Sequence, residues 1–247
     1  MATTTPSLSP DELRLFQQLV YTRIGVRLGD NKHALVQNRL RSRLRDRQLS
    51  SFSSYHQLLT EPAESEEMEL CINALTTNET YFYRHPLHWH WLSQHWASFG
   101  PAPRVWSAAC SSGEEPYTVA IELACRGITG GEIIGSDINS SVLDQAKRAS
   151  YSPYAVQKVE PVTLKERFRS RVRFERHNLM SATGPARNCD LVLLRNVLIY
   201  FDRESKRKVL DNILQALKPG GLLIIGGAEA LTDNRFDYEA PSIYRKR

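Results

Sequence analysis

The stretch RVWSAACSSGEEPY, residues 104–117, decides the fold of this chain. It opens with a short apolar run of strand length. Pro116 suits the first turn of a following helix, where the N–H that proline lacks is not needed. Between them lie only small residues, from Cys110 to Gly113. The stretch therefore predicts a strand, a tight turn and a helix N-terminus, the first unit of a doubly wound nucleotide-binding fold.

The composition of the turn limits the ligand. The G-x-G-x-x-G pattern of dinucleotide-binding loops is absent, and Glu114 and Glu115 stand where a pyrophosphate would meet the helix N-terminus. Carboxylates at this position repel a phosphate group. The turn therefore favours a ligand with hydroxyl groups or a positive charge.

Strands and helices alternate after this stretch, which predicts a mainly parallel sheet. Further strands are expected at residues 132–136, 172–176, 190–194 and 222–226. The tail, residues 236–245, is short enough to return as an antiparallel edge pair. The predicted fold class is α/β, with a doubly wound, mainly parallel, Rossmann-like sheet after a small all-α N-terminal domain.

The helical domain is expected over residues 1–76. Ser9 is a good N-cap for a first helix, and a second helix is expected from about Lys32 to Arg47. Outside its apolar stripe, the second helix carries Arg39, Arg41, Arg43, Arg45 and Arg47. Arginines at helical spacing usually form a solvated face.

Residues 77–103 are expected to connect this domain to the sheet domain, residues 104–247. The connecting segment contains an amphipathic, aromatic-rich helix at residues 86–99. A Gly-Pro-Ala-Pro cluster then leads into the strand that opens the sheet domain.

Composition excludes several classes of protein. The 247 residues have a formal net charge of +5 and are 41% hydrophobic, which is ordinary for a globular protein. No apolar run approaches the roughly 20 residues of a membrane span. The N-terminus shows no secretory signal pattern. Four widely spaced cysteines, Cys71, Cys110, Cys125 and Cys189, favour reduced thiols and a cytoplasmic location.

Polar residues follow the predicted strands at their C-terminal ends, where open α/β sheets bind ligands. Asp137 lies 24 residues beyond Gly113, close to the position of an acid that binds ribose hydroxyls. Asn178 and Arg195 follow two later strands. This set suits an adenosine ligand with a positive centre, such as S-adenosylmethionine (SAM). Asp137 as a simple helix-capping acid remains an alternative.

Six blocks of the sequence resemble one known family, the CheR-type protein-glutamate O-methyltransferases, which use SAM to methyl-esterify glutamates on chemotaxis receptors. The blocks are LTTNETYFYR (75–84), RVWSAACSSGEEPYTVAIEL (104–123), IIGSDINSSVLDQAKRASY (133–151), VRFERHNLM (172–180), CDLVLLRNVLIYFD (189–202) and LKPGGLLIIGGAEAL (217–231). They cover most of the chain.

The resemblance implies a set of site residues. The cofactor-binding residues would be Asn78, Thr80, Arg84, Glu115, Asp137, Asn178, Leu179, Arg195 and Asn196. Arg84 would lie near the reacting carboxylate and Tyr200 near the sulfonium methyl. The product would be S-adenosylhomocysteine. The partner would be the acidic helical cytoplasmic domain of a methyl-accepting receptor, docked through Arg39, Arg41, Arg43 and Arg45.

The implied chemistry is simple. A glutamate side chain is ionised at neutral pH, so it can attack a methyl carbon without a strong general base. The enzyme then has mainly to orient the reactants and exclude water. No cluster of metal ligands is visible in the sequence, so no metal is expected.

Two segments depart from the family pattern. Family members commonly carry a small antiparallel β-subdomain, which in some holds a receptor tail peptide. Here residues 150–171 are short and show no hairpin pattern, so the subdomain is shortened or absent and tail-peptide tethering is not expected. The usual histidine and serine before Glu229 are replaced by Gly227 and Ala228.

Two other functions stay open. The basic helix suggests a methyltransferase for another acceptor, including nucleic acid, but the Asp/Asn-Pro-Pro-Tyr motif of amino-methylating enzymes is absent. A non-catalytic SAM sensor or adaptor is the second alternative. Arg84 and Tyr200 favour an enzyme.

Overall fold

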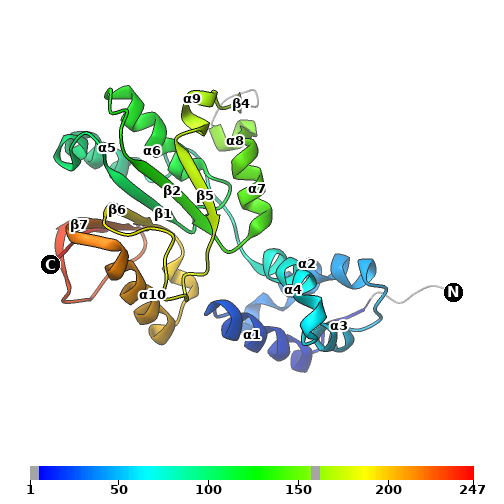
Figure 1. Cartoon of the computed structure of the whole chain (residues 1–247). Coiled ribbons are helices and arrows are strands. Elements are labelled where there is room, and N and C mark those ends of the chain that lie inside the picture. The colour runs from blue at the N-terminus through cyan, green and yellow to red at the C-terminus, as the bar shows by residue number, and fades with distance from the viewer. Residues whose placement is uncertain (1–5, 157–161) are drawn as a thin grey trace. The chain divides into compact units, whose positions relative to one another are not determined.

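The computed structural model describes residues 6–156 and 162–247, and the chain divides after Thr77 into two compact units (Figure 1). Each unit has its own core.

The N-terminal unit is helical. Its elements are α1 (Pro10–Ile24), η1 (Asp30–Lys32), α2 (His33–Asp46), α3 (Phe52–Leu59), η2 (Pro62–Glu64) and α4 (Ser65–Leu75). Ser9 caps α1 as predicted: its Oγ accepts from the Glu12 N–H, and the Glu12 carboxylate accepts from the Ser9 N–H. Phe16, Phe52 and Tyr55 pack together at the centre, with ring centroids 6.2–6.3 Å from Phe16.

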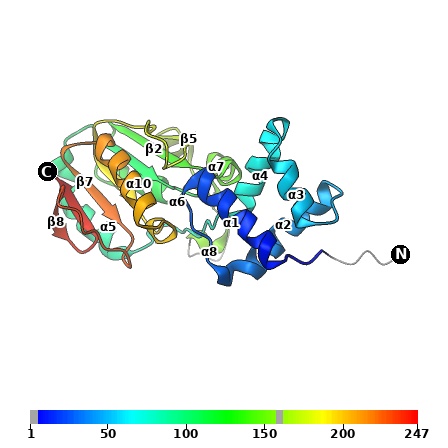
Figure 2. The same ribbon diagram turned by 90° about the horizontal axis from the view of Figure 1, so that it is seen from below.

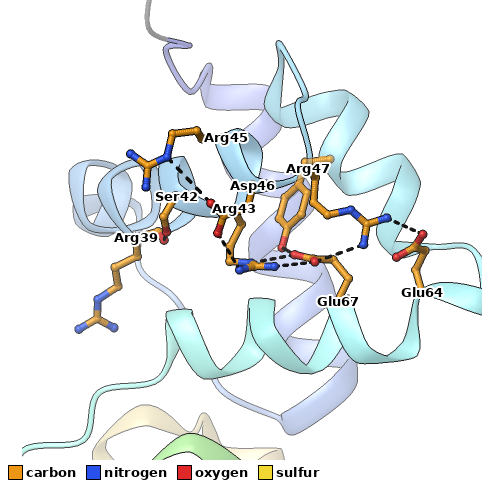
Figure 3. A network of polar contacts seen from close by, with 9 residues as sticks. Arg39, Ser42, Arg43, Arg45, Asp46, Arg47, Glu64 and Glu67 are labelled. Atoms are coloured by element: carbon orange, nitrogen blue, oxygen red, sulfur yellow. Dashed lines mark hydrogen bonds and ion pairs between the residues drawn. The ribbon is translucent and has the colours of Figure 1, made fainter.

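A buried carboxylate joins α2 to α4 (Figure 3). Glu67 is 3% exposed and accepts from Arg43 Nε and Nη2 at 2.9 and 2.7 Å and from the Tyr55 hydroxyl at 2.7 Å. Arg47 contacts Glu67 at 3.4 Å and Glu64 at 2.6 Å. Burial alone raises the pKa of Glu67, but the bonds from Arg43 and Tyr55 outweigh it and the pKa lies below its usual value.

This network corrects the sequence-based view of the arginine-rich helix as one free basic face. The side chain of Arg43 is only 19% exposed and is bound to Glu67, because it points from α2 toward α4. Arg39 donates to the Leu75 and Thr76 carbonyls at the end of α4. Arg45 remains 81% exposed. Arg43 and Arg39 therefore contribute to the packing of the unit.

The C-terminal unit alternates helices and strands. Its first half contains α5 (Pro86–His95), η3 (Trp96–Phe99), β1 (Arg104–Ala108), α6 (Glu114–Cys125), β2 (Glu132–Asp137), α7 (Ser140–Arg148), β3 (Ser150–Tyr151) and α8 (Pro153–Val156). The rest contains β4 (Val162–Thr163), α9 (Glu166–Arg169), β5 (Val172–Arg176), β6 (Cys189–Leu194), η4 (Leu198–Tyr200), α10 (Arg203–Ala216), β7 (Leu217–Ile225), β8 (Phe236–Ala240) and β9 (Ile243–Lys246).

The described residues form a seven-stranded sheet in the order β5-β2-β1-β6-β7-β9-β8. The first five strands in this order are parallel to one another. β9 runs antiparallel to β7, and β8 runs antiparallel to β9. The α/β class, the parallel strands and the antiparallel edge pair predicted from sequence are confirmed.

Alternate residues of the central strands enter different cores. Val105, Leu191 and Leu193 belong to a cluster that also holds Trp89 of α5 and Leu123 of α6. Helix α10 lies on the opposite face of the sheet (Figures 1 and 2). With both faces covered, parallel strands are buried along their length, and β6 is buried at all six positions.

The segment after α7 contains a minimal antiparallel pair. Ser150 pairs with Thr163 and Tyr151 with Val162. The sequence analysis found no hairpin in residues 150–171 because strands of two residues are too short to show alternation. Residues 157–161 of that segment lie outside the described residues.

Candidate functional site

The turn after β1 is held in an unusual backbone conformation. Ala109, Ser111 and Gly113 have φ values of 62°, 51° and 91°. A Cβ at Gly113 would lie 2.8 Å from the Ala146 Cβ and 3.2 Å from the Tyr151 hydroxyl, so only glycine fits there. The sequence prediction of a tight small-residue turn is confirmed.

Asp137, at the end of β2, holds this turn in place. Its Oδ2 accepts from the Ser111 N–H and its Oδ1 from the Asn139 N–H, both at 2.9 Å. The residue is 6% exposed, and burial raises the pKa of its carboxyl despite these bonds. Asn139 in turn caps α7, as its side chain accepts from Ser141 and Val142 N–H groups. The cap of α7 is therefore Asn139, and Asp137 supports it from the end of β2 without capping the helix itself.

A buried ion pair lies beside the turn. Glu115 accepts from Arg195 Nη1 at 2.7 Å and from the Ser107 hydroxyl at 2.6 Å. The Arg195 side chain is 3% exposed, and its guanidinium carbon lies 5.6 Å from the centre of the Trp89 ring. This pair joins the ends of β1 and β6 to α6, an ion pair that the sequence did not predict.

Asn196 is fixed by the loop after β7. Its φ is 59°, its N–H donates to Glu229 at 3.1 Å, and its Oδ1 lies 3.1 Å from His85 Nε2. The Glu229 carboxylate also accepts from the Gly226 N–H at 2.6 Å and the Ile199 N–H at 3.1 Å. The Glu229 carboxylate thus connects the loop after β6 to the loop after β7, at the C-terminal ends of these two strands.

Gly227 and Ala228, which replace the family's histidine and serine, lie in a loop where a side chain at position 227 would meet a neighbouring ring. A Cβ at Gly227 would lie 3.1 Å from His85 Nδ1. The His85 ring, which comes from the segment before α5, lies against this glycine. A side chain at position 227 would crowd the imidazole that reaches Asn196.

The segment before α5 contacts the strand ends mainly through its backbone. The Ser111 hydroxyl donates to the Asn78 carbonyl at 2.9 Å. Arg195 and Trp89 both donate to the Arg84 carbonyl. The Arg84 guanidinium itself donates to the Glu79 carbonyl at 2.7 Å and lies 5.7 Å from the Tyr81 ring centre. Thr80 is half-buried in the same segment.

The remaining predicted residues lie on loops after β5 and β6. Asn178 Oδ1 accepts from the Met180 N–H at 3.0 Å, and buried Leu179 accepts through its carbonyl from Asn212 of α10. Tyr200 is half-buried at the end of η4.

The strand-end residues suit a polar, positively charged ligand. Asp137 supplies a carboxylate with lone pairs to spare, whereas Glu115 and Arg195 pair with each other and offset each other's charge. Two buried side-chain atoms at these loops, Arg195 Nε and His177 Nε2, have no hydrogen-bond partner in the described part of the chain. Buried polar atoms of this kind are normally satisfied by a ligand or water. Residues 6–156 and 162–247 contain no group of His, Cys, Asp and Glu that could hold a metal ion.

Comparison with known proteins assigns the family. Residues 78–244 match the domain described as "CheR methyltransferase, SAM binding domain", and residues 11–76 match "CheR methyltransferase, all-alpha domain". The chain belongs to the CheR methyltransferase family. It is therefore a SAM-dependent methyltransferase with the two domains of that family, and SAM is its methyl donor.

Relatives match this chain over nearly its whole length. A chemotaxis protein methyltransferase of Escherichia coli is 34% identical, over 96% of this chain and 91% of its own. That of Klebsiella aerogenes is 35% identical over 94% and 87%, and that of Borreliella burgdorferi is 29% identical over 97% and 95%. The described residues contain no helix long and apolar enough to cross a membrane.

The sequence analysis missed several supporting residues of this CheR site. The Ser107 hydroxyl donates to the Glu115 carboxylate, and the Ser111 hydroxyl donates to the Asn78 carbonyl. The Glu229 carboxylate accepts from the Asn196 N–H. Serines in a strand and a turn carry no distinctive signal. The requirement for glycine at position 226 is visible only in the structure, where a Cβ would lie 2.7 Å from Glu229 Oε2.

Proposed function

We propose that this CheR protein methylates glutamate side chains of chemotaxis-type receptors and forms glutamate methyl esters. The observation that carries the proposal is the match of both domains, over nearly the whole chain, to relatives named chemotaxis protein methyltransferase. The chemistry fits, because a carboxylate acceptor is already ionised and needs no general base.

We assign the cofactor-binding role to the strand-end residues. Bound SAM supplies a methyl group on a sulfonium and leaves as S-adenosylhomocysteine. Asp137 would bind ribose hydroxyls, and Glu115 would lie near the methionine or sugar portion. Asn178 and Leu179 would flank the adenine. Asn78, Thr80, Arg195 and Asn196 would complete the pocket.

On the acceptor side, Arg84 would orient the glutamate carboxylate and Tyr200 would line the place of methyl transfer. Arg84 can do so because its guanidinium donates to one carbonyl, that of Glu79, and so keeps donors for a carboxylate. The segment carrying Arg84 would also exclude water, since its backbone is fixed to Arg195 and Trp89.

Receptor docking is assigned to the exposed part of α2. Arg45 is free for a partner apart from a 3.9 Å contact with Asp46, and Arg41 donates only at 3.4 Å to Asn38. Arg39 and Arg43 would act by holding α2 on α4. We expect docking without a receptor tail peptide and in the cytoplasm, where the four free thiols would stay reduced.

Transfer of radiolabelled methyl from SAM to purified receptor cytoplasmic fragments tests the proposal. We expect label that base releases as methanol, because methyl esters are base-labile. Base-stable label would indicate another acceptor. SAM binding without transfer to any receptor fragment would indicate a sensor.

A further inference from the structure

A second surface of the C-terminal unit has the character of a docking site. A groove of about 1460 Å³ lies between α10 and the loop from Ala228 to Arg235. This exceeds the ~300–1,000 Å³ usual for small-molecule pockets, so the groove suits a segment of another chain. It is separate from Asp137 and Glu115, which are not among its lining residues.

One wall of the groove is a basic stripe on α10. Arg203, Lys206 and Arg207 line it, are exposed, and form no ion pair within residues 6–156 and 162–247. Their spacing places them on one face of the helix. They also lie in its first turns, where the helix dipole disfavours cations. The stripe is therefore unfavourable for the helix alone and favourable for an anionic partner.

The other charged residues of the groove are three acids, Asp211, Asp233 and Glu229, and two cations, Arg235 and Lys246. Asp211 and Asp233 both pair with Arg235, at 2.5 and 2.6 Å. The Glu229 carboxylate accepts from three backbone N–H groups. These acids do not cancel the three free cations, so the groove is electropositive.

Apolar side chains line the groove next to the basic stripe. Leu210, Leu214 and Leu231 lie deeper, and Ile199 is 56% exposed at the rim. An apolar floor with a basic edge fits an amphipathic helix with acidic residues, which is about 10–12 Å across.

The groove is continuous with the acceptor side of the site. Leu198 and Ile199 line it, and Tyr200 follows directly in η4. Glu229 also lines the groove and binds the Ile199 and Asn196 N–H groups. A helix in the groove would therefore run along η4, the element that ends in Tyr200.

We propose that this groove docks the acidic helical segment of the receptor that carries the acceptor glutamates, an inference that rests on the proposed function. The basic stripe on α10 attracts the acidic face of that segment, and the leucines take its apolar face. The groove thus sets which glutamate reaches Tyr200.

Charge reversal of the stripe tests this inference. The double variant Lys206→Glu/Arg207→Glu is compared with Lys208→Glu/Arg187→Glu, which makes the same charge change at exposed residues outside the groove. The readouts are KM and kcat for methylation of receptor fragments by the full chain, with SAM affinity measured by calorimetry. We expect the groove variant to raise KM about ten-fold, with kcat and SAM affinity little changed.

Two results would overturn the docking inference alone. One is an equal change in KM for the groove variant and the control variant. The other is a groove variant that methylates the receptor as the wild type does but no longer binds a DNA duplex. Failure of the wild-type protein to methylate any receptor fragment would instead overturn the proposed function, and this inference with it.

Discussion

Asp137 has two tasks at one carboxylate. It binds the Ser111 and Asn139 backbone N–H groups and so fixes the turn after β1. Each carboxylate oxygen has a second lone pair, which leaves acceptor capacity for a ligand hydroxyl. The acid is thus both a structural residue and a candidate ribose ligand.

Asp137→Ala is expected to weaken SAM binding by roughly 1–3 kcal/mol, because ribose hydrogen bonds are lost and the turn loses its support. Calorimetry measures the affinity, with exposed Asp144→Ala on α7 as the control. Unchanged affinity in Asp137→Ala would place the ribose elsewhere.

His88 gives the protein a pH dependence. Burial lowers its pKa to about 4, and the charges of Arg195 and His85 act in the same direction. The folded state therefore binds the proton less well than the unfolded chain. Stability is fully present above the unfolded pKa of about 6.5 and is lost as the pH falls toward 4.

We expect His88→Leu to reduce this loss by up to about 3 kcal/mol between pH 6.5 and 4. Urea unfolding at a series of pH values measures it, and exposed His90→Leu is the control. Equal pH profiles for the wild type and His88→Leu would contradict the prediction.

At the scale of elements, α2 depends on α4. The buried Glu67 carboxylate accepts hydrogen bonds from Arg43, Arg47 and the Tyr55 hydroxyl. Removing one partner of a buried ion pair leaves the other charge uncompensated. The Glu67 carboxylate therefore helps to orient α2, beside the Arg39 bonds to the end of α4 and the Arg47–Glu64 ion pair.

Glu67→Gln is expected to destabilise the N-terminal unit by about 3 kcal/mol at pH 7, because Arg43 loses its charged partner. The pKa of Glu67 is depressed in the folded state, so the wild-type advantage should vanish as the pH falls below about 4.5. Denaturant unfolding measures both, with exposed Glu66→Gln as the control. An equal effect of the two substitutions would show that the network adds no stability.

Two arginines of α2, half-buried Arg41 and exposed Arg45, make a separate prediction. Reversing Arg41 and Arg45 to Glu should slow receptor methylation and leave SAM affinity alone, because the docking helix would repel an acidic receptor. Initial rates and calorimetry measure the two effects. Arg14→Glu/Arg27→Glu, at exposed positions of the same unit, is the charge-matched control. A rate equal to that of the control would end the docking role of α2.

At the scale of the whole molecule, the net charge of +5 favours association with an acidic partner. We expect KM for the receptor to rise steeply with salt while kcat changes little, because the Debye length falls from about 10 Å at 0.1 M to about 3 Å at 1 M. Methylation rates over this range of sodium chloride test it, with KM for SAM as the control. A KM for the receptor that is independent of salt would contradict electrostatic docking.

The sequence determined the fold class because its signals are local. Apolar runs such as 190–194, the small-residue turn ending at Gly113 and the Ser9 cap each depend on neighbouring residues only. Local patterns of this kind predict strands, turns and helix starts reliably. The parallel sheet and its antiparallel edge followed from the order of these elements.

The sequence also placed Asp137 and Arg195 at strand ends and Glu115 at a helix N-terminus, but it did not give their partners. That Arg195 is bound to Glu115, and Glu229 to the Asn196 N–H, depends on residues 33 to 80 positions apart. The partner of Arg43 is likewise set by tertiary packing, because α4 must pack on α2 before Glu67 comes within reach of its guanidinium. Local sequence fixes where a side chain starts; only tertiary packing decides what it meets.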